Sequence, residues 1–135
     1  MENQEIEYKQ SWQDEYLATI SAFANSKGGK LIIGINDKGN IIGLEDHKKL
    51  LKILPNKIKN KLGILPEINL IKMKDKPVIE IKVNPSSFPI SYNGKFYIRS
   101  GSTTQTLEGQ ELITFLLQKT GQTWDGLLEY HFRKA

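Results

Sequence analysis

The chain contains no cysteine and only two histidines among its 135 residues. Without cysteine there is no disulfide bond, and a zinc site built from cysteine and histidine is excluded as well. The sequence has no apolar run near the length of about 20 residues that crosses a bilayer, and its acidic start is unlike a signal peptide. These absences predict a soluble, cytoplasmic protein that does not use a membrane.

Size and charge set the broad class of the chain. A chain of 135 residues with 39% hydrophobic and 25% charged residues is long enough to bury a core, which favours a single domain over residues 1–135. Within it, residues 121–135 form a tail that docks as a short helix or leads towards a further domain. The formal net charge of +4 permits an anionic partner such as nucleic acid but does not require one.

The stretch Phe23–Asp37 is the centre around which we expect the fold to form. It reads as the end of an amphipathic helix, then Gly28 and Gly29, then the apolar run Lys30–Asn36. Glycine allows the left-handed conformation that closes a helix, and a short apolar run bounded by turn residues is typical of a buried strand. We therefore expect a helix that runs directly into a central strand.

The segments on either side of this centre also carry clear patterns. Glu5–Lys9 alternates polar and apolar residues, which is the period of a half-buried strand, and Ser11 provides a start signal for the helix that follows. After the central strand, the turn residues Asp37–Asn40 lead to Ile41–Leu44, which we expect to return as a hairpin partner.

A second helix is predicted from Asp46, as its N-cap, to about Leu62. Pro55 removes a backbone donor, so we expect this helix in two pieces. The later elements are a strand pair, a hairpin with an Asn-Gly turn and a helix ended by Gly121, over the ranges Glu67–Lys74, Pro77–Val83, Ile90–Arg99 and Leu107–Lys119. Helix–strand pairs mixed with hairpins predict an α+β fold, with a mixed β-sheet packed against about three helices.

Several charged and glycine residues have two interpretations. The lysines of the second helix are either the solvated face of an amphipathic helix or a surface that contacts phosphates. Glu7 and Lys9 share one face of the first strand, where a surface ion pair is the simplest interpretation. Gly28 and Gly29 follow a helix, whereas a phosphate-binding loop follows a strand, so ATP binding is unsupported.

Four short motifs occur in one order along the chain: Glu7–Lys9, Ala22–Asn25 followed by two glycines, Ile33–Asp37, and Phe96–Ser102. In this order and spacing, the chain resembles the Schlafen AlbA-like domain over about residues 2–124. That family is the DNA-binding module of bacterial and archaeal helicase-related transcriptional regulators. The resemblance implies an α+β lobe that binds DNA or RNA, is usually followed by other domains, and forms a homodimer because the Schlafen core pairs two lobes.

Under this resemblance, basic side chains would contact phosphates, with an attraction that falls steeply as salt rises. The candidate contacts are Lys9, Lys27, Lys30, Lys48, Lys49, Lys52, Lys57, Lys59, Lys61, Lys95 and Arg99.

The eukaryotic Schlafens imply an alternative function, because some of them are RNA endonucleases with an acidic triad. Carried over position by position, the triad falls on Glu2, Glu7 and Glu45, with Glu45 where the nuclease pattern has aspartate. Clustered carboxylates can hold Mg²⁺ or Mn²⁺, which stabilises charge on a scissile phosphate, and Lys9 could assist. Without nuclease activity no cofactor is expected.

A third alternative is a protein-interaction module. For that function we expect an exposed apolar patch near residues 124–132 of the tail.

Overall fold

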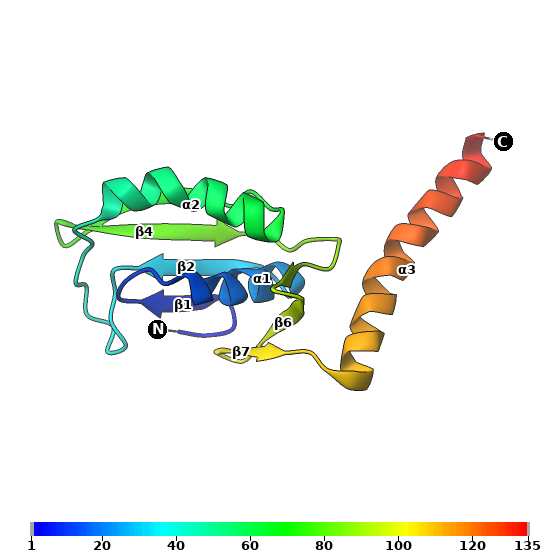
Figure 1. The fold of residues 1–135 in the computed structure, drawn as a ribbon, viewed down its shortest axis with the longest axis horizontal. Helices are drawn as coiled ribbons and strands as arrows, with labels where there is room; N and C mark the ends of the chain where they lie inside the picture. The colour runs from blue at the N-terminus through cyan, green and yellow to red at the C-terminus, as the bar shows by residue number, and fades with distance from the viewer. Residues whose placement is uncertain (1, 135) are drawn as a thin grey trace.

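The computed structural model describes residues 2–134, and the side chains of residues 2–121. Within that range the chain forms two β-sheets and three α-helices, which confirms the predicted α+β class (Figure 1). The elements, with one 3₁₀ turn η1, are β1 (Ile6–Lys9), η1 (Asp14–Tyr16), α1 (Leu17–Asn25), β2 (Gly29–Ile33), α2 (His47–Leu62), β3 (Glu67–Met73), β4 (Lys76–Val83), β5 (Ser91–Tyr92), β6 (Lys95–Ser100), β7 (Thr103–Thr106) and α3 (Gly109–Lys134). No helix within residues 2–134 is long and apolar enough to cross a bilayer.

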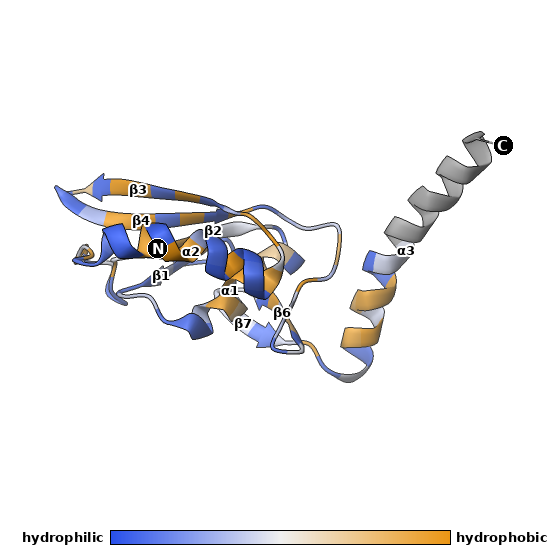
Figure 2. Cartoon of the chain, turned by 45° about the horizontal axis from the view of Figure 1, so that its top comes forward, coloured by the Kyte–Doolittle hydropathy of each residue, from blue (hydrophilic) through white to orange (hydrophobic). Residues whose placement is uncertain are grey.

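The larger sheet has four strands in the order β1-β2-β4-β3. β1 runs parallel to β2, and the other neighbours are antiparallel, so the sheet is mixed as predicted. Alternate residues of its central strands, such as Leu31 and Ile81, are fully buried and join apolar residues of α1 and α2 in one core. Figure 2 shows the alternation of apolar and polar residues along β3 and β4, which is typical of strands with one covered face.

The smaller sheet has three antiparallel strands in the order β5-β6-β7. Asn93 and Gly94 both have positive φ, as the tight turn between β5 and β6 requires, so the predicted Asn-Gly hairpin is confirmed. The polar residues 100–106, for which the sequence predicts no strand, contain the third strand of this sheet. Gly101 turns the chain back, and Thr103–Thr106 pairs with β6 as the edge strand β7.

The first helix and the central strand differ from prediction at their ends. α1 begins at Leu17 rather than near Ser11, and the η1 turn precedes it without a side-chain cap. β2 ends at Ile33, because Gly34 has a φ of 117° and its N–H and that of Ile35 both point to the carbonyl of Lys9. Beyond it, the expected return strand is reduced to a single bridge between Ile35 and Ile41.

α2 has the predicted bounds but not the predicted break, and α3 is longer than the sequence predicts. α2 runs without a break through Pro55, so the predicted split is wrong. Proline in a helix costs roughly 3 kcal/mol, but the buried row of Leu50, Leu54 and Ile58 continues across it, and that packing holds the helix together. The predicted end of the last helix at Gly121 is also wrong, since α3 continues to Lys134.

Candidate nucleic-acid interface

The glycine pair of the central motif has a structural role. Gly28 has a φ of 79°, which favours glycine, and its N–H closes α1 on the carbonyl of Phe23. A side chain on Gly29 would lie 2.5 Å from the Phe23 ring and 2.7 Å from the carbonyl of Glu5. The bare backbone lets β1 and α1 approach β2 closely, so the motif positions β1, which carries Glu7 and Lys9.

Asn25 joins α1 to the smaller sheet. Its side chain is buried, and its Nδ2 donates to the carbonyl of Ile90 at 2.8 Å and to that of Tyr97 at 2.9 Å. Its Oδ1 accepts from the N–H of Ile90 at 2.8 Å. The asparagine of the motif therefore has a packing role: it fixes the β5–β6 hairpin against α1.

Arg99, predicted as a phosphate contact, lies in the interior. Its guanidinium is fully buried, and its Nη1 is 2.9 Å from a carboxylate oxygen of Glu7. Its Nη2 donates to the carbonyl of Asn3 at 2.8 Å, and its Nε to that of Gln4 at 3.1 Å. These bonds tie β6 to β1 and to the segment before it. The prediction that Arg99 contacts phosphate is wrong for this structure, because its charge is enclosed and paired.

Two further contacts complete the surroundings of Arg99. Its Nη1 also donates to the hydroxyl of Thr104 at 3.1 Å, and its Cζ lies 4.8 Å from the centre of the Phe23 ring. Burial lowers the pKa of Arg99, and the charge of Glu2 acts in the opposite direction. Arginine stays protonated at any working pH, so the network holds a permanent cation.

The acids of the predicted nuclease triad do not form a site. Glu7 is engaged by Arg99, and the carboxylate of Glu2 accepts from the N–H of Tyr8 at 3.2 Å. Glu45 is exposed and lines a separate hollow at the start of α2, beside Asp46. In the part of the chain that the structure describes, no three acidic or histidine side chains are grouped to hold a metal ion. The predicted metal ligands are therefore not brought together.

The lysines of α2 form the main basic surface. This helix carries six lysines and no acidic residue. Five of them are exposed without an ion pair in residues 2–121, and four of these five lie away from η1: Lys48, Lys49, Lys52 and Lys59. Spacings of four and seven residues place Lys48, Lys52 and Lys59 in one row, away from the buried row. We call these three residues the α2 lysine row.

The other two lysines of α2 lie on its side towards η1. Lys57 donates to a carboxylate oxygen of Asp14 at 2.9 Å. The charge of Lys61 also acts on this carboxylate. Hydrogen bonds from Lys57 and then from Trp12 lower the pKa of Asp14, whose carboxylate stays largely exposed. The sequence places all six lysines on one helix, and the structure divides them between two sides.

The remaining predicted contacts are spread over the molecule. Lys30 lies 3.7 Å from Glu80 on the open face of the larger sheet, and Lys9 lies over the ring of Tyr16. Lys27 is exposed in the turn after α1, and Lys95 is exposed at the start of β6. None of these four residues belongs to the surface of α2.

Two exposed lysines near α2 were missed by sequence reasoning. Lys72 and Lys74 lie at the end of β3, an edge strand that packs beside α2. A short loop joins α2 to β3, so the helix and the strand run antiparallel to each other. The end of β3 therefore lies near the start of α2, where Lys48 is. Only the tertiary structure brings Lys72 and Lys74 close to the lysines of α2. The alternation of residues along β3 does place Lys72 on the face of the sheet that α2 covers.

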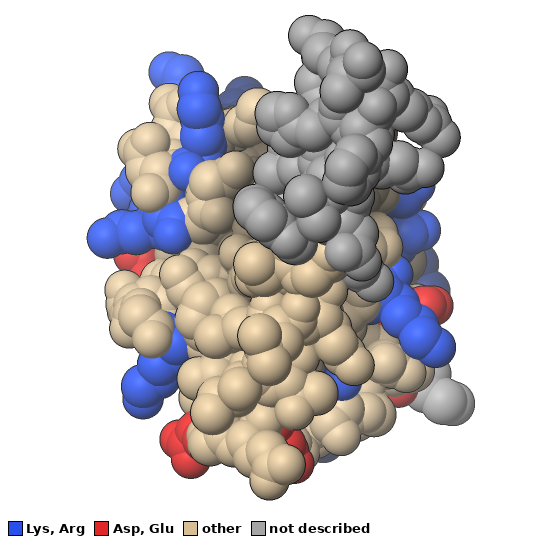
Figure 3. All heavy atoms as spheres, turned by 90° about the vertical axis from the view of Figure 1, so that its right-hand side faces the viewer, with Lys and Arg blue, Asp and Glu red and all other residues tan. Residues whose placement is uncertain are grey.

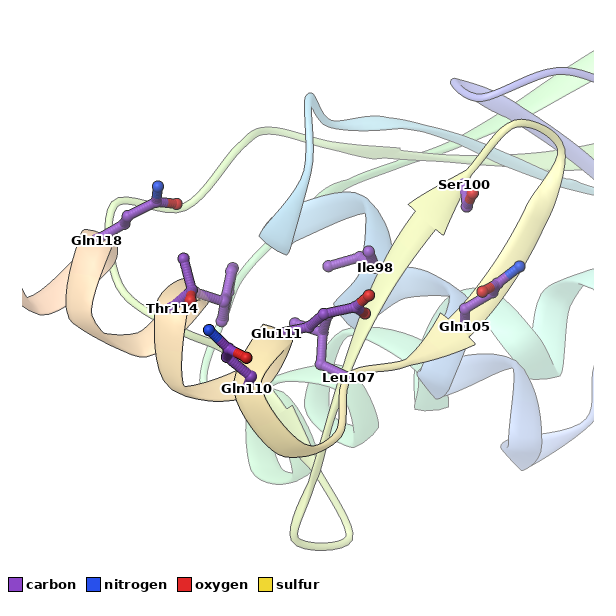
Figure 4. Close-up of a pocket in the computed structure, with 9 residues that line it drawn as sticks. Ile98, Ser100, Gln105, Leu107, Gln110, Glu111, Thr114 and Gln118 are labelled. Atoms are coloured by element: carbon purple, nitrogen blue, oxygen red, sulfur yellow. The ribbon is translucent and has the colours of Figure 1, made fainter.

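A cleft between α3 and the β6–β7 hairpin has a different character (Figure 4). It has a volume of about 670 Å³ and is lined by uncharged side chains such as Ile98, Gln105 and Phe115, with Glu111 as its one charged group. A cleft with a carboxylate and no cation does not attract phosphate, so the candidate interface is the surface of α2 and not this cleft.

Comparison with known proteins is consistent with the motifs. The family model described as Schlafen, AlbA_2 matches residues 2–108, and the chain belongs to this family. The solution structure of the N-terminal domain of an ATP-dependent DNA helicase RecG-related protein from Nitrosomonas europaea is 30% identical, with a TM-score of 0.53, over 78% of this chain and 85% of that domain.

A crystal structure from Corynebacterium diphtheriae shares the fold. It is 22% identical with a TM-score of 0.63, and the match covers 78% of this chain and 22% of that protein. The chain thus spans about a fifth of the Corynebacterium protein and most of the Nitrosomonas domain.

Proposed function

We propose that this domain binds nucleic acid through the sugar–phosphate backbone, with the surface of α2 as its contact face. The observation that carries the proposal is a helix with six lysines and no acid, several of them exposed and unpaired in the described part of the chain. Membership of the family and similarity to a domain of a helicase-related protein support nucleic acid over other anions. A lysine that contacts a phosphate gains no information about the base sequence, so binding is sequence-nonspecific or weakly specific.

The biological setting follows from the same resemblance. The domain would attach a transcriptional regulator to DNA in the cytoplasm, as the AlbA-like modules of helicase-related regulators do. The experiment below includes RNA because phosphates alone do not distinguish the two nucleic acids.

The test measures fluorescence anisotropy of a labelled DNA duplex and a labelled RNA hairpin at about 50 mM salt, where electrostatic binding is strong. Wild-type protein is compared with the triple variant Lys48→Gln, Lys52→Gln, Lys59→Gln, which removes the α2 lysine row. The matched control, Lys30→Gln, Lys38→Gln, Lys82→Gln, lowers the net charge equally, from +4 to +1, on other surfaces.

We expect the first variant to lose most of its affinity and the control to keep it. Equal losses in both variants would mean that net charge alone attracts the ligand, and no binding by wild-type protein to either nucleic acid would end the proposal.

A further inference from the structure

The two β-sheets have four outer strands, and β7 differs from the other three. β1 and β3 each carry charged side chains, and β5 has only two residues, so charge or short length protects each of these edges. β7 reads Thr-Thr-Gln-Thr, without charge, proline or glycine. Threonine favours strands, and an uncharged edge is a template on which another strand can pair.

The backbone of β7 offers hydrogen-bonding groups on its outer side. The N–H of Leu107 donates to the carbonyl of Phe96 at 2.8 Å, which fixes the alternation of bonds along the β6–β7 pair. By this alternation, the N–H and carbonyl groups of Thr104 and Thr106 point away from β6. No other strand within residues 2–134 lies on that side, and no other described segment bonds to these groups. β7 can therefore pair with one more strand.

The cleft between α3 and the β6–β7 hairpin lies beside this edge (Figure 4). Gln105, which pairs with Ile98, lies on the face of β7 that lines the cleft. Ile98, Leu107 and Phe115 make part of the lining apolar, and Figure 4 shows Glu111 directed from α3 towards the hairpin. Side chains alternate along a strand, so every second side chain of a strand added to β7 would enter the cleft.

The charge on this side of the molecule favours a basic ligand. Residues 100–118 contain two acids, Glu108 and Glu111, and no basic residue, although the whole chain has a net charge of +4. Glu111 is exposed and makes no ion pair within residues 2–121. Figure 3 views this side: basic side chains lie mainly on its flanks and acidic side chains at its lower end, with uncharged surface between them. A lysine or arginine that entered the cleft would meet a complementary charge.

We propose that β7 is a docking edge for an extended, basic segment of a partner protein. The segment pairs antiparallel with β7 through the backbone of Thr104 and Thr106, and a lysine or arginine opposite Gln105 enters the cleft and pairs with Glu111. The open backbone identifies the ligand as polypeptide, because another strand repeats N–H and carbonyl groups at the spacing of β7. This role is separate from nucleic-acid binding, since none of these residues belongs to the surface of α2.

The first test is an NMR titration of the whole ¹⁵N-labelled chain with the acetylated, amidated peptide Val-Thr-Lys-Thr-Val-Thr. A strand this short should bind with a Kd of about 0.1 to 1 mM, so the peptide is added to about 5 mM. We expect the largest shift changes at the amides of Thr104 and Thr106, with slower exchange of both amides with solvent. The absence of changes at β7 overturns the inference.

N-methylated peptides test strand pairing on the unchanged protein. Methylation of the three threonines removes the N–H groups that point to β7 in the proposed pairing, so it should abolish binding. Methylation of the two valines and the lysine removes only N–H groups that point away from β7, so it should leave the affinity nearly unchanged. Equal affinities for the two methylated peptides overturn the inference.

Protein variants test the edge and the charge separately. Thr106→Pro removes an outward N–H, which an edge strand tolerates, and should abolish peptide binding, whereas Thr106→Ala keeps the N–H and should bind as wild-type protein does. Glu111→Gln should weaken binding of the lysine peptide about two- to fivefold and remove its advantage over Val-Thr-Glu-Thr-Val-Thr. Circular dichroism should show equal structure in all variants. Full binding by Thr106→Pro, or an unchanged preference for lysine in Glu111→Gln, overturns the inference.

A second copy of the chain is the competing occupant of this edge. If the protein alone sediments as a dimer that Thr106→Pro makes monomeric, and it takes up no peptide, a second copy pairs with β7 and the inference falls. Binding to DNA should be equal in wild-type protein, Thr106→Pro and Glu111→Gln, because the surface of α2 is unchanged. A loss of DNA affinity in either variant would place nucleic acid at β7 and overturn the inference.

Discussion

Arg99 and the α2 lysine row carry the same charge and have opposite environments. The Arg99 guanidinium is fully buried between a carboxylate, two backbone carbonyls and an aromatic ring. The lysines of the row are exposed and have no ion pair in the described residues. A buried cation must be matched by polar partners in the fold, and its enclosure keeps it from a phosphate in solution. An exposed lysine keeps its water and its charge, so it remains available to phosphate.

The two regions have different roles in the molecule. The Arg99 network joins β1, β6 and the segment before β1, and with it the two sheets. The buried apolar row of α2 holds this helix on the sheet, and the lysines lie on its other side. Changes around Arg99 should therefore alter stability, and changes in the lysine row should alter binding without altering stability.

The largest effect on stability is expected for Arg99→Met. It leaves the nearly buried Glu7 carboxylate and two carbonyls without their donors, and breaking a buried pair in this way costs about 3 to 5 kcal/mol. Urea unfolding followed by circular dichroism measures the loss. Arg99→Lys should recover part of it, since one charge remains.

A loss below about 1 kcal/mol, the level of an exposed pair, would contradict the role given to Arg99. The lysine-row variant serves as the control, because it removes three charges and should leave the unfolding midpoint unchanged.

Asn25→Ala should have the next largest effect, about 2 to 3 kcal/mol, because it leaves the buried carbonyl and N–H of Ile90 without partners. The smaller sheet should loosen first, so amide exchange of β6 should accelerate more than that of β2. Asn60→Ala, at an exposed position of α2, should cost no stability. Equal unfolding midpoints for both variants would remove the link between the motif and the hairpin.

Gly29→Ala tests the close approach of α1, β1 and β2. The added methyl group would lie 2.5 Å from the Phe23 ring, so the ring or the strand must shift, at about 1 to 3 kcal/mol. Gly121→Ala is the matched control, because nothing lies within 4 Å of the position and alanine favours a helix. A thermal midpoint of Gly29→Ala equal to that of wild-type protein would mean that the glycine is not required for packing.

Lys57→Gln should have the smallest effect, below about 1 kcal/mol, because its pair with Asp14 is exposed. The pair holds the pKa of Asp14 below its ordinary value of 3.8, so its contribution is present above that pH and is lost as pH falls through the lowered pKa. The difference between the two proteins should thus be seen near pH 7 and vanish near pH 2. If the difference in stability between the two proteins persists near pH 2, it comes from packing of the Lys57 side chain and not from the ion pair.

Local patterns predicted much of the fold. The Asn-Gly hairpin, the β3–β4 pair and the helix–glycine–strand centre each depend on neighbours in the sequence, and all three are present. β7 was missed because Thr103–Thr106 has no apolar alternation and gains its place by pairing with β6. The continuity of α2 through Pro55 depends on a buried row, and packing of that kind is settled by tertiary structure.

The candidate site was predicted less completely. The lysines of α2 could be found from composition, but the sequence could not tell that Lys57 faces Asp14 or that Lys72 lies near the start of the helix. Arg99 looked like a surface cation because polar residues follow it in the sequence, and its partners Asn3, Gln4 and Glu7 lie more than 90 positions earlier. The expected patch near residues 124–132 lies outside the described side chains.

The salt dependence of DNA binding tests the central claim most directly. Each phosphate contact contributes about 0.9 to the slope of log K against log salt for a duplex. If the α2 lysine row makes the contacts, the Lys48→Gln, Lys52→Gln, Lys59→Gln variant should show a slope reduced by about 2 to 3, and the Lys30→Gln, Lys38→Gln, Lys82→Gln control should keep the wild-type slope. Equal slopes for wild-type protein and the lysine-row variant would contradict the account.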